Sequence, residues 1–232
     1  MEPTAKTPPA RVRIRRIPKN ASYDRASVNR VLDRGRVGHV SFGDEGQPYC
    51  IPTLFARIED RVLIHGSSAS RMVRLLSAGA PACLTVTLFD GWVLARSAFE
   101  TGVNYESVTL LGCFRTIADS RKLAELQAFM EVVLPGRWSE VRPPSAQELK
   151  ATAILELEIG EASVKAHRGP PDDDLSADAA LDVWAGTIPV AERYGAPVPS
   201  PALREGIPLS PSVERLAATS PPPPGSGRDG RV

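Results

Sequence analysis

One short segment of the sequence combines the residue types that bind a phosphate group. The run His65-Gly66-Ser67-Ser68-Ala69-Ser70-Arg71 lies where an apolar strand pattern ends and a helical pattern begins. The start of a helix presents free backbone N–H groups and the positive end of the helix dipole. Serine hydroxyls add donors, and the Arg71 guanidinium adds charge and a forked donor. The segment indicates either a site for a phosphorylated ligand or an ordinary serine-capped helix with a solvated arginine.

The remaining histidines and acidic residues form no comparable pattern. His39, His65 and His167 lack the spacing of a metal site, and we interpret His39 as a barrel histidine. His167 beside Arg168 is interpreted as an exposed loop histidine that could reach a cofactor or a haem. The acidic run Asp172–Asp174 lacks the glycine turn and the terminal glutamate of a calcium loop, so we expect it to be solvated.

Apolar periodicity predicts the elements that must position these residues. Strands are expected over residues 37–42, 49–58, 61–65, 82–88, 92–99, 105–117 and 152–159. Asp90-Gly91 is expected to form a hairpin turn, and Gly112 could mark a bulge. Pro52 interrupts the second strand, which is typical of an edge, a bulge or a backbone that faces something other than a strand. Short strands joined by hairpins predict a mainly β, antiparallel barrel with inserted helices.

The chain divides into three parts by composition. Residues 1–21 are basic and Pro-rich and are expected to form an arm, residues 22–211 a single domain, and residues 212–232 a disordered Pro-rich tail. Hydrophobic residues make up 42% of the 232 residues, which is enough for a core. Lys and Arg number 28 against 27 Asp and Glu, so charge gives no reason to expect nucleic acid or an acidic membrane as partner.

Targeting signals are not evident in the sequence. No stretch approaches the ~20 apolar residues of a membrane span, and the basic N-terminus lacks the apolar run of a secretory signal. Cys50, Cys83 and Cys113 form no C-x-x-C pair and lie in apolar, strand-like runs, so buried free thiols are expected. A cytoplasmic protein is the resulting expectation.

Several short motifs follow one another along the chain. They are Val37-Gly38-His39-Val40-Ser41-Phe42, Gln47-Pro48-Tyr49 with Ile51-Pro52-Thr53, Ile64-His65-Gly66-Ser67 with Ser70-Arg71, Asp90-Gly91-Trp92 up to Phe99, Asn104-Tyr105-Glu106-Ser107-Val108, Pro135-Gly136-Arg137-Trp138 and Trp184-Ala185-Gly186-Thr187-Ile188-Pro189. In this order they resemble the pyridoxamine 5'-phosphate oxidase-like family of flavin-binding proteins, and most closely its nitroimidazole-resistance-type branch.

This resemblance implies an antiparallel Greek-key split barrel that forms a homodimer and binds FMN between its two chains. A strand from Cys50 would run along the flavin ring, His65 would lie near the ring and act in catalysis, and Ser70 and Arg71 would hold the phosphate. The cofactor-binding residues that it implies are Cys50, Ile51, Pro52, Thr53, Ile64, His65, Ser70, Arg71, Asn104 and Ser107.

Three departures from the family pattern qualify this expectation. The oxidases carry a lysine where this chain has Met72, which leaves the phosphate with one cation fewer. The branch more often has an arginine at Glu106, and a carboxylate facing the cofactor would weaken its binding. The chain also lacks the basic C-terminal motif of the oxidases, which argues against oxidation of a B6 vitamer.

The sequence therefore predicts an FMN-binding oxidoreductase that acts on a small molecule, with a nicotinamide donor or dioxygen as co-substrate. FAD, a deazaflavin and haem are alternative cofactors. A non-catalytic flavin- or haem-binding protein and a cofactor-free split-barrel interaction domain are the alternative functions.

Overall fold

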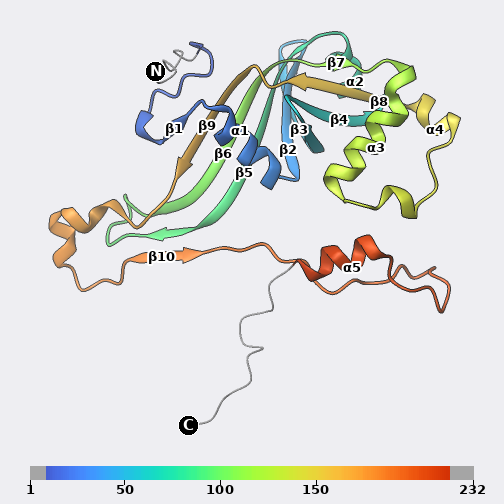
Figure 1. Ribbon diagram of the computed structural model, residues 1–232. Coiled ribbons are helices and arrows are strands. Elements are labelled where there is room, and N and C mark those ends of the chain that lie inside the picture. Colours follow the sequence, from blue (N-terminus) through green and yellow to red (C-terminus); the bar gives the residue numbers. More distant parts are fainter. Residues whose placement is uncertain (1–8, 220–232) are drawn as a thin grey trace, which may run out of the picture.

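Antiparallel strands dominate the computed structural model, which describes residues 9–219 (Figure 1). The strands are β1 (Ala21–Ser22), β2 (Val37–Asp44), β3 (Gln47–Ile58), β4 (Arg61–Ser67), β5 (Pro81–Leu94), β6 (Gly102–Cys113), β7 (Arg115–Thr116), β8 (Thr152–Glu158), β9 (Glu161–His167) and β10 (Gly186–Pro189). They form one sheet in the order β1-β9-β6-β5-β2-β3-β4-β8-β7, and β10 pairs with β5. The predicted mainly β, antiparallel fold is confirmed.

Five α-helices accompany the sheet in the described residues: α1 (Arg25–Arg34), α2 (Arg71–Ser77), α3 (Lys122–Val133), α4 (Ala146–Ala151) and α5 (Pro211–Ala218). Polar caps fix where three of them begin. Asp24 accepts from the backbone of α1, Ser70 from that of α2 and Ser145 from that of α4. Within residues 9–219, no helix is long and apolar enough to cross a membrane.

The main core lies between the inner face of the sheet and helices α1 and α2. Its fully buried side chains come from both halves of the sheet and both helices, and they include Val31, Val40, Leu76, Leu84, Leu110 and Leu155. A smaller cluster joins Ala56 and Leu63 to Phe129 of α3. Burying one such side chain stabilises the fold by about 1.5–3 kcal/mol, so α3 fixes the region where β3 and β4 meet.

The pair Asp90-Gly91 does not form the predicted hairpin turn. Strand β5 runs through it, and the register with β6 shifts between Phe89 and Gly91. A Cβ on Gly91 would lie 2.5 Å from the carbonyl oxygen of Ile188, so glycine admits β10 alongside β5. The hairpin prediction is wrong because aspartate and glycine serve equally well at a bulge.

Gly112 is not a bulge either, since it pairs in register with Ala82. A Cβ on Gly112 would lie 2.8 Å from Leu157 Cδ1. The glycine therefore allows β6 to pass close to a core side chain of β8.

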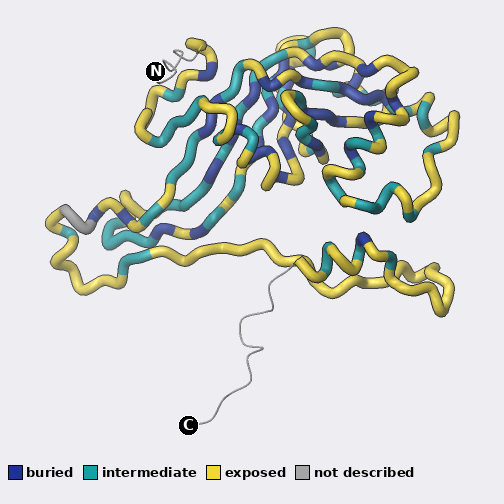
Figure 2. Tube along the Cα trace, in the orientation of Figure 1, coloured by how far each residue is buried: buried dark blue, intermediate teal, exposed yellow. Residues whose placement is uncertain are grey.

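The chain beyond β10 contains a helix that the sequence analysis does not predict. Residues 190–209 are exposed along their whole length and lead to α5, which is placed below α3 and α4 in Figures 1 and 2. Residues 212–218, which the sequence analysis assigns to a Pro-rich tail, form most of α5 in the structure, and Glu140 binds the first turn of this helix. Residues 220–232, and residues 1–8 of the predicted arm, lie outside the described residues.

Candidate functional site

Strands β3 and β4 separate partway along their length. They pair only between Phe55–Ile58 and Arg61–Ile64. Further along, β3 stays beside β2 while β4 continues beside β8 as far as Ser67. The sheet is therefore open along residues 49–54 of β3, and we call this opening the split.

The backbone of β3 presents alternate residues to the split. The Phe55 N–H donates to the Arg36 carbonyl oxygen at 3.4 Å, towards β2. Since hydrogen-bonded pairs alternate in an antiparallel ladder, the backbone groups of Cys50, Pro52 and Leu54 point away from β2. Within residues 9–219 no strand pairs with them there. Proline has no N–H to donate and fits such an edge, while the free carbonyl and N–H groups can bind the polar rim of a ligand.

Helix α2 begins beside the split and brings the predicted phosphate residues to it. Ser70 caps the helix through the Val73 N–H at 3.2 Å. Arg71 lies over the Tyr49 ring at 4.6 Å from its centroid and 3.5 Å from an Asp44 carboxylate oxygen. Met72 Sδ lies 3.9 Å from Thr53 Oγ1. Thr53, Ser70 and Arg71 are therefore grouped at one place, and Arg71 is half-exposed and available to a ligand.

His65 and Ile64 mark the end of the split but differ in their surroundings. Ile64 is fully buried in the main core, so only its backbone can contact a ligand. His65 lies just past the last β3–β4 pair, with its ring edge-on to Phe129 at 4.8 Å between centroids. Desolvation lowers the pKa of His65 below its ordinary value of 6.5, so the imidazole is mainly neutral at pH 7.

The other predicted residues of β3 lie on both faces of the strand. Ile51 is opposite the core residue Val40, and Cys50 and Pro52 are opposite Ser41 and His39 on the other face. Cys50 and Cys113 are exposed and Cys83 is half-buried, all as free thiols. The prediction of buried cysteines is wrong because strand residues of this sheet alternate between the core and an uncovered outer face.

Asn104 and Ser107 lie away from the split. Both belong to β6, which β5 and β2 separate from β3. Three strand spacings correspond to about 14 Å, so one chain does not bring these two residues to Arg71. Ser107 donates to the Lys165 carbonyl oxygen at 3.3 Å. Asn104 donates to the Gly169 carbonyl oxygen at 3.0 Å and lies 3.0 Å from His167 Nδ1.

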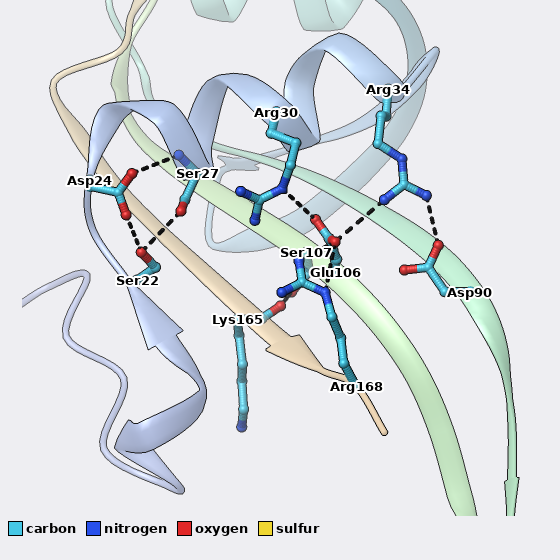
Figure 3. Close-up of polar contacts among 10 residues, drawn as sticks. All are labelled: Ser22, Asp24, Ser27, Arg30, Arg34, Asp90, Glu106, Ser107, Lys165 and Arg168. Atoms are coloured by element: carbon cyan, nitrogen blue, oxygen red, sulfur yellow. Dashed lines mark hydrogen bonds and ion pairs between the residues drawn. The ribbon is translucent and has the colours of Figure 1, made fainter. Parts of the chain in front are cut away.

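Glu106 faces neither the split nor solvent. It is 4% exposed and is surrounded by Arg168, Arg30 at 3.3 Å and Arg34 at 3.4 Å (Figure 3). Desolvation would raise the pKa of this carboxyl, but the hydrogen bonds and charges of Arg168 and then Arg30 outweigh it and lower the pKa. The carboxylate therefore organises three arginines and presents no free negative charge.

Asp173 is also buried, contrary to the expectation that the acidic run is solvated. It is 2% exposed and accepts from the Arg96 backbone at 2.6 Å and from its guanidinium at 3.1 Å. The prediction is wrong for Asp173 because its partner, Arg96, is 77 residues away in the sequence and no local pattern shows the pair. This ion pair fixes the segment that leads from β9 to β10.

A separate cavity of about 480 Å³ opens near the far end of β2, β5 and β6. Its lining includes Arg11, Ser41, Cys83 and Cys113 but none of the predicted cofactor residues. It is therefore distinct from the split.

Comparison with known proteins identifies the family. Residues 24–166 match the family model described as pyridoxamine 5'-phosphate oxidase. The chain belongs to this family, as its motifs predicted. A search of curated proteins finds no match.

Two solved structures resemble the chain over nearly their full length. The FAD and haem binding protein from Mycobacterium smegmatis is 40% identical, with a TM-score of 0.82 over 85% of this chain and 97% of that one. The flavocytochrome Anf3 from Azotobacter vinelandii is 38% identical, with a TM-score of 0.85 over 90% of this chain and 97% of that one.

A third structure shares the fold. It is a protein from Bacteroides thetaiotaomicron provisionally described as a 5-nitroimidazole antibiotic resistance protein. It is 18% identical, with a TM-score of 0.53 over 62% of this chain and 85% of that one.

Proposed function

We propose that this protein is a homodimeric oxidoreductase that binds FAD in the split and carries a haem. The observation that carries the proposal is the split itself, an open β3 edge beside the helix start that holds Ser70 and Arg71. Two solved structures of FAD- or haem-containing proteins, 40% and 38% identical, support it.

The charge of the split favours FAD over FMN. The FMN phosphate is a terminal monoester and carries about −1.5 to −2 on one phosphate at pH 7, whereas the diphosphate of FAD divides a similar total charge between two phosphates that carry one negative charge each. Arg71 is followed by Met72, and Arg71 already lies 3.5 Å from the Asp44 carboxylate. One partly neutralised cation suits a single negative charge better than a double one.

Exposed apolar side chains on the outer face support a two-fold dimer. Val37 and Leu54 are directly opposite each other on β2 and β3, and both are exposed. Ile188 of β10 is also exposed. Apolar side chains exposed on the outer face favour an interface, and an isologous contact would cover the same residues on both chains.

Within this proposal the cofactors supply the redox chemistry and the chain supplies position and polarity. Flavin exchanges electron pairs and haem single electrons, with a nicotinamide or dioxygen as the co-substrate. The β3 backbone and Thr53 would orient the flavin, and Arg71 would hold a phosphate. Neutral His65 beside the split would supply or accept a proton.

The purified protein tests the cofactors directly. We expect flavin and haem absorption together, FAD on acid release, and a haem b pyridine complex. FMN alone would favour the small-molecule FMN enzyme, and a colourless protein that takes up neither cofactor would overturn the proposal. Light scattering should give a dimer, and a flavin-loaded monomer would exclude a site shared between chains.

A charge deletion tests the phosphate contact. Hydrogen bonds to charged groups contribute about 1.5–3 kcal/mol, so Arg71→Ala should weaken FAD binding by about 10- to 150-fold. Riboflavin has no phosphate and should bind almost as before. Arg74→Ala is the matched control, because Arg74 is an exposed arginine one turn further along α2. Equal losses for FAD and riboflavin would show that Arg71 supports the fold instead.

A further inference from the structure

His167 is held in a fixed orientation by a residue 63 positions away. It is the last residue of β9 and half-buried, not the exposed loop histidine that its sequence context predicts. Its Nδ1 lies 3.0 Å from Asn104 Oδ1, and Asn104 Nδ2 donates to the Gly169 carbonyl oxygen at 3.0 Å.

These two contacts determine the tautomer of His167. A backbone carbonyl can only accept, so Asn104 must turn its NH₂ group towards Gly169 and its oxygen towards the imidazole. Nδ1 must then carry the proton that is donated to Asn104. In the neutral ring the lone pair is left on Nε2, and a histidine that ligates a metal is arranged in this way.

The other two histidines lack this arrangement. In the described part of the chain, neither ring nitrogen of His39 or His65 has a hydrogen-bond partner. His65 contacts Phe129 edge-on, and His39 is exposed on β2. His167 is thus the histidine whose ring orientation is already set.

An aromatic surface adjoins His167. In the sheet register His167 is directly opposite Tyr105, and Tyr105 is directly opposite Phe89. Residues directly opposite each other in antiparallel strands lie on the same face. Phe89 is 42% exposed and packs against Trp92, which is 49% exposed, at 5.4 Å between ring centroids. The series of neighbouring residues from His167 through Tyr105 therefore ends at the exposed pair Phe89 and Trp92, whose rings suit a flat apolar ligand.

We propose that His167 is an axial ligand of the haem iron through Nε2, and that Asn104 is the positioning residue that sets its tautomer. This inference rests on the proposed function, which supplies the haem. It names the protein atom that would bind the iron and the aromatic surface of Phe89 and Trp92 against which the macrocycle would pack. Ligation by neutral imidazole forms one nitrogen–iron bond in place of a water bound to the free haem iron, and it releases no proton.

Spectroscopy of the protein reconstituted with hemin tests the ligand. The wild type should show the Soret band and electron paramagnetic resonance signal of an imidazole-ligated haem. His167→Ala should lose that signal and bind hemin at least tenfold more weakly, and added imidazole should restore it. His39→Gln is the matched control that should keep the wild-type spectrum, and FAD content should not change in this variant or in His167→Ala.

Two variants of Asn104 test the positioning role. Loss of an outer hydrogen-bond partner typically costs about 10- to 100-fold in metal affinity, so Asn104→Leu should weaken hemin binding by that factor. Asn104→Asp keeps an acceptor for Nδ1–H and should retain binding, with a lower haem midpoint potential because a carboxylate makes the imidazole more electron-rich.

The outcomes separate this inference from the proposed function. A wild-type protein that takes up no haem would overturn the haem part of the proposed function, and the ligand assignment with it. Haem bound with an unchanged spectrum in His167→Ala would overturn only the assignment of His167. Equal hemin affinities of the Asn104→Leu and Asn104→Asp variants would overturn the role of Asn104.

Discussion

Glu140 caps the C-terminal helix α5 through Ser212. The Ser212 backbone N–H donates to one carboxylate oxygen at 2.8 Å and the Ser212 hydroxyl donates to the other. These hydrogen bonds, Ser212 first, lower the pKa of Glu140 from 4.5 to about 2. A lowered carboxyl pKa means that the contact is fully present above pH 4.5 and weakens as the pH falls towards 2.

Glu140→Gln should therefore loosen α5 without unfolding the sheet. Hydrogen–deuterium exchange at pH 7 should increase across residues 211–218 and stay unchanged in β2 and β5. Glu205→Gln, in the exposed segment before α5, is the control and should have no effect. Unchanged exchange in the Glu140 variant would show that other contacts hold the helix.

Glu106→Gln should destabilise the fold by about 1.5–3 kcal/mol, the worth of hydrogen bonds to charged groups. Arg30, Arg34 and Arg168 would lose their shared anion, but each is near half exposure and can turn to solvent. Urea denaturation measures the change. Glu161→Gln breaks an exposed pair with Arg11 and should cost at most about 1 kcal/mol.

Asp173→Asn should release the segment that precedes β10. Removing the charge weakens the buried contact between Asp173 and Arg96, and hydrogen bonds to charged groups contribute about 1.5–3 kcal/mol. Hydrogen exchange should rise over residues 172–189. Asp172→Asn changes the exposed neighbour and should leave the exchange of this segment as it is.

Gly91→Ala should displace β10 from β5. The added methyl group would lie 2.5 Å from the Ile188 carbonyl oxygen, a backbone atom that cannot turn aside. We expect faster amide exchange at Thr187 and Ile188. Gly43→Ala adds the same group where no atom lies within 4 Å, so β10 should stay protected in that variant. If both variants behave alike, β10 does not depend on the glycine.

His65 should make the folded state sensitive to mild acid. Its pKa is lowered by desolvation, so the folded protein resists protonation and loses stability as the pH falls below the unfolded value of about 6.5. The melting temperature of the wild type should fall more between pH 7.5 and 5.5 than that of His65→Gln. In the loaded enzyme, His65→Gln should also lower turnover with an artificial acceptor while flavin content is retained.

Local patterns were sufficient to predict much of the framework. Strands β2, β3, β4 and β8 follow strong apolar periodicity, and the strand-to-helix junction at Ser70 was located from its residue types alone. Strand β9 was missed because the segment from Glu161 to His167 has few large apolar residues. It is a strand because β6 and β1 pair with it on its two sides.

The errors at the candidate site come from contacts between distant residues. Glu106 is surrounded by arginines from α1 and from the end of β9, and His167 is oriented by a β6 residue. Helix α5 depends on Glu140, which precedes it by 72 residues. No local pattern carries these pairings, since each exists only once the sheet has formed.

The prolines of β3 have a consequence for solubility. An unpaired strand edge is a template for another chain, and natural proteins blunt such edges with proline. The ring nitrogen of Pro52 lies on the open side of β3, where another residue would offer an N–H to a foreign strand. Pro48 lies four residues earlier and therefore points its ring nitrogen to the same side. Newly made protein that has not yet acquired a ligand is thereby protected from edge-to-edge aggregation.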